Sequence, residues 1–124
     1  AYTEEPGDLR YALRSSGTGA DNNPGQFTTK WPDAINNADN SPVIRTTEVL
    51  LNYVEAKAEA DNAVSQELID RMNVLRSRAG LAAWSLGDFA SKDAFVTAVL
   101  NERWKELAFE GHRRMDLLRR GLPL

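Results

Sequence analysis

From about residue 44 onward, apolar side chains recur at the three- and four-residue spacing that is typical of amphipathic helices. We predict four helices, at about 45–61, 66–79, 92–110 and 112–120. The first carries two neighbouring apolar strips, so it is expected to pack between other helices. Its main strip is Leu50, Leu51, Val54 and Ala58, and the second includes Val49 and Tyr53.

The second predicted helix has recognisable signals at both ends. Ser65 is suited to cap its N-terminus, because a serine hydroxyl accepts a hydrogen bond from a free backbone amide. Arg76 and Arg78 lie in its last turn, where cations suit the helix dipole, and Gly80 suits the left-handed conformation that closes a helix. Only a few residues join the first two helices, so we expect them to pack antiparallel.

The third and fourth predicted helices meet at Gly111, which interrupts the helical pattern. The fourth helix is expected to bury Met115 and Leu118. The predicted buried face of the third consists of Phe95, Val96, Val99, Leu100, Trp104, Leu107 and Ala108. Because so many faces are apolar, we also expect some to stay exposed, giving a dimer or a marginally stable monomer.

Residues 1–43 form a predicted second region, a loop-rich strap of mostly irregular structure. It contains four of the eight glycines and four of the five prolines, together with clusters of Asn and Asp, all of which favour turns. A short helix or extended run fits at residues 8–13, and another short piece fits near residues 31–35. The predicted fold class is therefore all-α, with helical hairpins at 44–124 preceded by this strap.

The composition excludes several classes of function. The chain has 124 residues, is 42% hydrophobic and 27% charged, and carries a net charge of −3, which is too balanced for a main partner that is a nucleic acid. It has no cysteine, hence no disulfide or thiolate site. No segment approaches the roughly 20 apolar residues that cross a bilayer. The chain begins at Ala1 without a methionine, so we expect a processed or excised piece of a longer protein.

Glu102, Glu106 and Glu110 recur every four residues and so lie along one edge of the third predicted helix. Two such carboxylates are able to act as an acid and a base. Basic residues are interleaved with them, however, which favours paired charges over a catalytic pair. The interleaved residues are Arg103, Lys105, Arg113 and Arg114.

His112 is the single histidine, and no Glu-x-x-His motif precedes it, so a di-metal helical site is disfavoured. We predict no metal, no cofactor and no enzyme activity.

Phe27 and Trp31 lie in the loop-rich strap, where aromatic rings are placed to stack on sugar faces. We take both as candidate ligand-binding residues. The alternative, that they fix the strap to the helices, stays open.

Three segments in this order resemble the SusD/RagB family. They are PVIRTTEVLLNYVEAKAEAD at 42–61, NVLRSRAGL at 73–81 and NERWKELAFEGHRRMDLLRRG at 101–121. The last is similar to the family signature Glu-Arg-x-x-Glu-Leu-x-x-Glu-Gly-x-Arg-x-x-Asp-Leu-x-Arg. Thr46, Thr47 and Met115 depart from the residues that are common in the family.

The resemblance implies TPR-like helical hairpins in an outer-membrane, cell-surface lipoprotein held by a lipid anchor outside this chain. Such a protein captures oligosaccharide, or sometimes peptide, for a SusC-like TonB-dependent transporter. A TPR-like scaffold for protein–protein interaction is the alternative function.

We also hypothesise that the signature residues form a structural ion network that fixes how the helices cross. Removing one partner of a desolvated pair typically costs about 3–5 kcal/mol. The predicted members are Arg45, Glu48, Glu55, Glu102, Arg103, Glu106, Glu110, Arg113 and Asp116.

Overall fold

The computed structural model describes residues 5–18, 22–31, 39 and 42–123. Helices make up most of it, and a short β-hairpin precedes them. In chain order the elements are η1 (Leu9–Leu13), β1 (Arg14–Thr18), β2 (Pro24–Thr28), α1 (Thr46–Asp61), α2 (Gln66–Arg78), η2 (Leu86–Asp88), α3 (Lys92–Glu106) and α4 (His112–Arg119).

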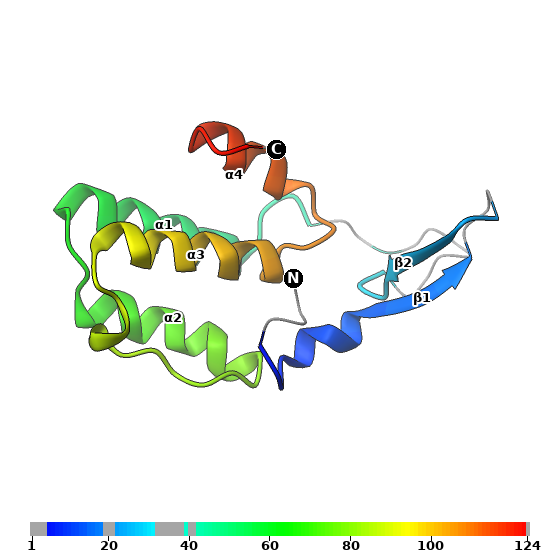
Figure 1. The fold of residues 1–124 in the computed structure, drawn as a ribbon, viewed down its shortest axis with the longest axis horizontal. Coiled ribbons are helices and arrows are strands. Elements are labelled where there is room, and N and C mark those ends of the chain that lie inside the picture. Colours follow the sequence, from blue (N-terminus) through cyan, green and yellow to red (C-terminus); the bar gives the residue numbers. More distant parts are fainter. Residues whose placement is uncertain (1–4, 19–21, 32–38, 40–41, 124) are drawn as a thin grey trace.

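Helices α1, α2 and α3 surround one hydrophobic core, and α4 lies against the outer side of this group (Figure 1). The loop between α2 and α3 closes one end of the core with aromatic rings. Phe89 lies 5.1 Å, centroid to centroid, from both Trp84 and Phe95, in edge-to-face geometry that suits aromatic quadrupoles. The largest fully buried apolar side chains are Leu51, Val54, Leu68, Ile69, Met72, Phe95, Val96 and Val99.

The predicted ends of α2 are confirmed. The Ser65 side chain accepts a hydrogen bond from the Leu68 amide, and Gly80 has a φ of +74°. The Leu9 amide donates to the Ala79 carbonyl at 2.9 Å, so η1 begins directly on the closing turn of α2. A glycine is needed in this turn both for its positive φ and because the N-terminal segment approaches so closely.

The expectation of an all-α fold was wrong. Strands β1 and β2 pair antiparallel, with Arg14 opposite Thr28 and Thr18 opposite Pro24. Figure 1 shows this hairpin extending away from the helical group. Most of its side chains are exposed or only partly buried on both faces, so no alternation of apolar residues marks it in the sequence. The predicted division of the chain at residue 43 stays a prediction.

The third helix is shorter than predicted, because α3 ends at Glu106 and not at residue 110. The chain then turns through Phe109, whose φ is +67°, and Gly111, whose φ is +82°. Helix α4 does not bury Met115 and Leu118, which are 62% and 47% exposed. Its buried residue is Asp116, so polar contacts attach α4 to the rest of the fold.

Within the described part of the chain, no helix combines the length and apolar character that crossing a membrane requires.

Gly80→Ala is expected to destabilise the fold more than Gly121→Ala. Both glycines have positive φ, which costs an L-residue about 1–2 kcal/mol. A Cβ at Gly80 would also lie 2.8 Å from Leu9 Cγ and 3.2 Å from the Gly7 carbonyl oxygen, whereas one at Gly121 meets nothing within 4 Å. We therefore expect about 1 kcal/mol more loss in the free energy of unfolding for Gly80→Ala, measured by urea denaturation. Equal losses in the two variants would contradict the close packing of η1 on α2.

Candidate functional site

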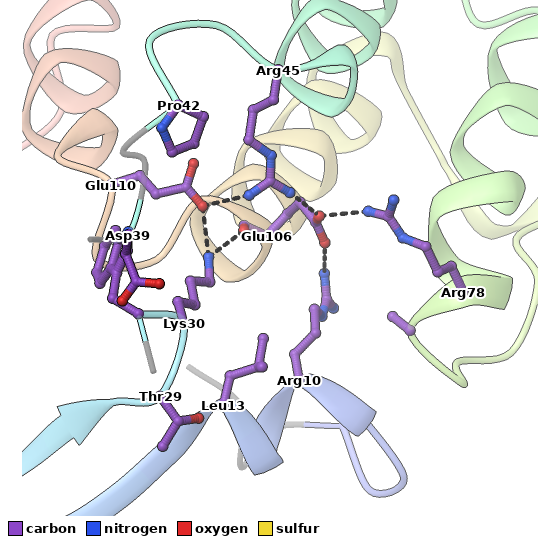
Figure 2. Close-up of a pocket in the computed structure, with 12 residues that line it drawn as sticks. Arg10, Leu13, Thr29, Lys30, Asp39, Pro42, Arg45, Arg78, Glu106 and Glu110 are labelled. Carbon is purple, nitrogen blue, oxygen red and sulfur yellow. Dashed lines mark hydrogen bonds and ion pairs between the residues drawn. The ribbon is translucent and has the colours of Figure 1, made fainter. Parts of the chain in front are cut away.

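A cavity of about 530 Å³ lies where the base of the hairpin meets the end of α3, the start of α1 and the end of α2. Figure 2 shows its charged side chains converging from these separate elements. Charged residues supply most of the polar groups in its wall: Arg10, Lys30, Asp39, Arg45, Arg78, Glu106 and Glu110.

The Glu106 carboxylate, in the last turn of α3, meets arginines from three segments (Figure 2). Its Oε1 accepts hydrogen bonds from Arg45 Nη2 and Arg78 Nη2, each at 2.6 Å, and its Oε2 lies 3.4 Å from Arg10 Nη1. Only 7% of Glu106 is exposed to solvent, so these charge-assisted bonds replace lost hydration. One carboxylate therefore ties α3 to η1, α2 and the residue that precedes α1.

Glu110, in the turn after α3, extends the same cluster. Its Oε1 accepts a hydrogen bond from Lys30 Nζ at 2.7 Å and from Arg45 Nη1 at 2.5 Å. Lys30 Nζ also donates to the Glu106 carbonyl oxygen at 2.8 Å. The lysine thus satisfies a free carbonyl at the C-terminal end of α3 and holds the hairpin base to it.

Glu102 is almost completely buried, at 1% exposure. It pairs with Arg10 Nη2 at 2.6 Å and with Arg76 Nη1 at 2.9 Å. Both arginines are themselves buried. Arg10 also binds Asp8 through two nitrogens, at 2.8 and 2.7 Å, so the charges on this side of α3 form one continuous buried network.

Two opposing effects act on the pKa of Asp8. Burial disfavours its charged form, but the hydrogen bonds and positive charge of Arg10 outweigh burial, so the pKa of Asp8 lies below its ordinary value. The same set of contacts raises the pKa of Arg10, although burial alone would lower it.

A second ion cluster attaches α4 to α1 and α3. Arg103 Nε donates to Asp116 at 2.8 Å, and Arg103 Nη1 donates to Asn52 at 2.8 Å. Arg119 Nη2 donates to Glu55 at 2.7 Å and to Asp116 at 3.0 Å. Glu48 lies farther away, with its Oε1 at 3.7 Å from Arg103 Nη2.

Eight of the nine predicted network members lie in these two clusters. Arg45, Glu102, Glu106 and Glu110 lie in the first; Glu48, Glu55, Arg103 and Asp116 lie in the second. Arg113 takes another role: its guanidinium lies 4.9 Å from the Trp104 ring centroid, and it donates to the Leu100 carbonyl at 3.5 Å. Among the described residues, no carboxylate pairs with it.

Sequence reasoning missed Arg10, Lys30, Arg76 and Arg78 as partners of these carboxylates. Arg10 and Lys30 are 96 and 76 residues from Glu106, so no helical spacing connects them. Only Arg76 and Arg78 carried a signal, since both stand in the segment NVLRSRAGL.

The two aromatic candidates lie in different places. Trp31 is partly buried and lines the cavity. Phe27 is 41% exposed and packs beside Gly17 and Gly25 of its own hairpin, with ring carbons about 3.5 Å from a Cβ built at either glycine. Of the two candidates, Trp31 is therefore the one that lines this cavity.

Comparison with known proteins gives one match. The sequence model of a family described as the SusD family matches residues 14–122, which include the hairpin and all four α-helices. No curated protein and no solved structure matches the chain.

The pairing of Asp8 with Arg10 predicts a pH-dependent contribution to stability. Because the folded-state pKa of Asp8 is depressed, its contribution is present above about pH 4 and is lost as the pH falls through the folded pKa. The free energies of unfolding of wild type and Asp8→Asn should therefore differ most at pH 5 and above, and the difference should shrink as the pH falls below about 4. Asp61→Asn, which removes an exposed partner of Lys57, is the control with little effect. If the free energy of unfolding of wild type exceeded that of Asp8→Asn by the same amount at every pH, the depressed pKa of Asp8 would be contradicted.

Proposed function

Because this chain belongs to the SusD family of cell-surface nutrient-binding proteins, we propose that it is the helical part of a protein that captures oligosaccharide. The family match over residues 14–122 is the observation that carries the proposal. A peptide is the other ligand class that we consider. The captured nutrient passes to a SusC-like TonB-dependent transporter.

The charge arrangement supports binding and not catalysis. Glu102, Glu106 and Glu110 are each engaged by arginine or lysine at 2.5–2.9 Å. A general acid or base needs a carboxyl group that is available to substrate, whereas these carboxylates already hold the fold together. The cluster serves as a rigid support for the cavity wall.

The cavity beside Trp31 is the proposed ligand-binding site. A volume of about 530 Å³ is within the range of small-molecule sites. The indole ring offers an apolar face for a sugar ring, and Thr29, Lys30 and Arg78 supply polar groups in the same wall. Fixed polar groups of this kind orient a ligand that an aromatic face holds.

Exposed apolar side chains on two helices favour contact with a further polypeptide. Val49 and Tyr53 on α1 are 54% and 39% exposed, and Met115 and Leu118 on α4 are similarly open. We propose that the transporter or another part of the assembly covers them, with the protein held at the outer membrane by a lipid anchor. The same surfaces suit the alternative function, a TPR-like scaffold that binds proteins alone.

Trp31→Ala should weaken oligosaccharide binding about tenfold, since an aromatic contact contributes about 1–1.5 kcal/mol. A glycan array with the full-length protein identifies the saccharide, and isothermal titration calorimetry then compares the variants. Phe27→Ala is the matched control, because Phe27 does not line the cavity, and it should bind like wild type.

The function proposed is wrong if the protein binds neither glycans nor peptides and co-purifies with no TonB-dependent transporter. If Phe27→Ala weakens binding and Trp31→Ala does not, the proposed function stands but the binding site lies elsewhere.

A further inference from the structure

A second cavity, of about 420 Å³, lies between the hairpin and the turn that joins α3 to α4. Arg14 and Gln26 line it from β1 and β2, and Trp104 and Phe109 line it from the end of α3 and the turn. Arg103 and Asp116 of the second ion cluster also line it. Its volume is sufficient for a ligand of one or two sugar rings.

Both aromatic rings of this cavity are accessible. Trp104 is partly buried and Phe109 is 47% exposed. Phe109 also has a φ of +67°, a conformation that bulky residues rarely adopt and that a glycine would adopt without cost. A strained, exposed aromatic residue in a cavity wall points to a binding role for its side chain.

The cavity wall carries an excess of positive charge. Four arginines line it against one acidic residue, Asp116, and Arg103 already pairs with that aspartate. Within the described residues, no carboxylate pairs with Arg113 or Arg114, and Arg114 is exposed. Two guanidinium groups beside two aromatic rings therefore have capacity for an anionic ligand.

We propose that this second cavity binds the uronic acid residue of an acidic oligosaccharide. The C–H face of the sugar ring packs on Trp104 and Phe109, while the sugar carboxylate accepts hydrogen bonds from Arg113 and Arg114. This inference rests on the proposed function, since it assigns a class of saccharide to the same protein. It concerns a different cavity from the one beside Trp31.

The experiment titrates the protein with tri-galacturonate and tri-mannuronate and with the methyl ester of each, which keeps the sugar ring and removes the charge. We expect the acids to bind at least tenfold more tightly than the esters, and added salt to weaken the acids selectively. In ¹⁵N spectra, the Trp104 indole signal should shift on binding while that of Trp84, which packs against the core away from this cavity, should not.

Arg114→Gln should weaken binding of the acid about tenfold, as expected for the loss of one charge-assisted hydrogen bond. Arg71→Gln, which removes an equally charged and exposed residue on α2, is the matched control and should bind like wild type. Phe109→Gly should weaken binding while its melting temperature stays at or above that of wild type, because glycine relieves the backbone strain.

Equal affinity for acid and ester, failure of both acids to bind, or unchanged binding by Arg114→Gln would overturn the proposal. A tri-glutamate peptide that binds as tightly as the acidic sugars would also overturn it, by showing a general anion site. If neutral saccharides bind in a Trp31-dependent manner while the acids do not, only this inference fails. If no saccharide binds at all, the proposed capture of oligosaccharide fails as well.

Discussion

The buried pairing of α3 carboxylates with arginines from other segments is the interaction on which the rest of the structure depends. Glu102 and Glu106 lie one helical turn apart, and both are almost completely removed from solvent. A desolvated carboxylate is costly unless cations satisfy it, so every alternative packing that separates these groups is disfavoured. Arg10 contacts both glutamates, and Arg45, Arg76 and Arg78 complete the set. Hydrophobic burial drives the helices together, but this charge set fixes which ends meet.

The same pairing positions the hairpin, which has little apolar contact with the helices. Arg10 precedes β1 and Lys30 follows β2, and both are held at the C-terminal end of α3. At the junction of η1 and β1, Leu13 lines the first cavity and Arg14 lines the second. A hairpin fixed at its base by charge thus contributes residues to the walls of both cavities.

The sequence was informative where structure is local and uninformative where it is not. Helical periodicity and the caps at Ser65 and Gly80 predicted α2 closely, because these signals act within a few residues. The hairpin was missed because Arg-Ser-Ser-Gly-Thr and Pro-Gly-Gln-Phe-Thr bury little and therefore show no apolar alternation. The row of glutamates on α3 was visible, yet Arg10 and Lys30 were not, since their pairing depends on the tertiary fold. Arg113 left the expected network because the Trp104 ring offered it a nearby aromatic face.

A double-mutant cycle on Arg10 and Glu102 tests the central claim most directly. The variants Arg10→Met, Glu102→Gln and their combination are compared with wild type by urea denaturation. Each single change removes a partner at 2.6 Å from a buried charge, so we predict a coupling free energy above about 2 kcal/mol. The exposed pair of Arg71 and Glu67 is the reference, at about 0.5 kcal/mol or less. A coupling between Arg10 and Glu102 no larger than that of the exposed pair would contradict the account.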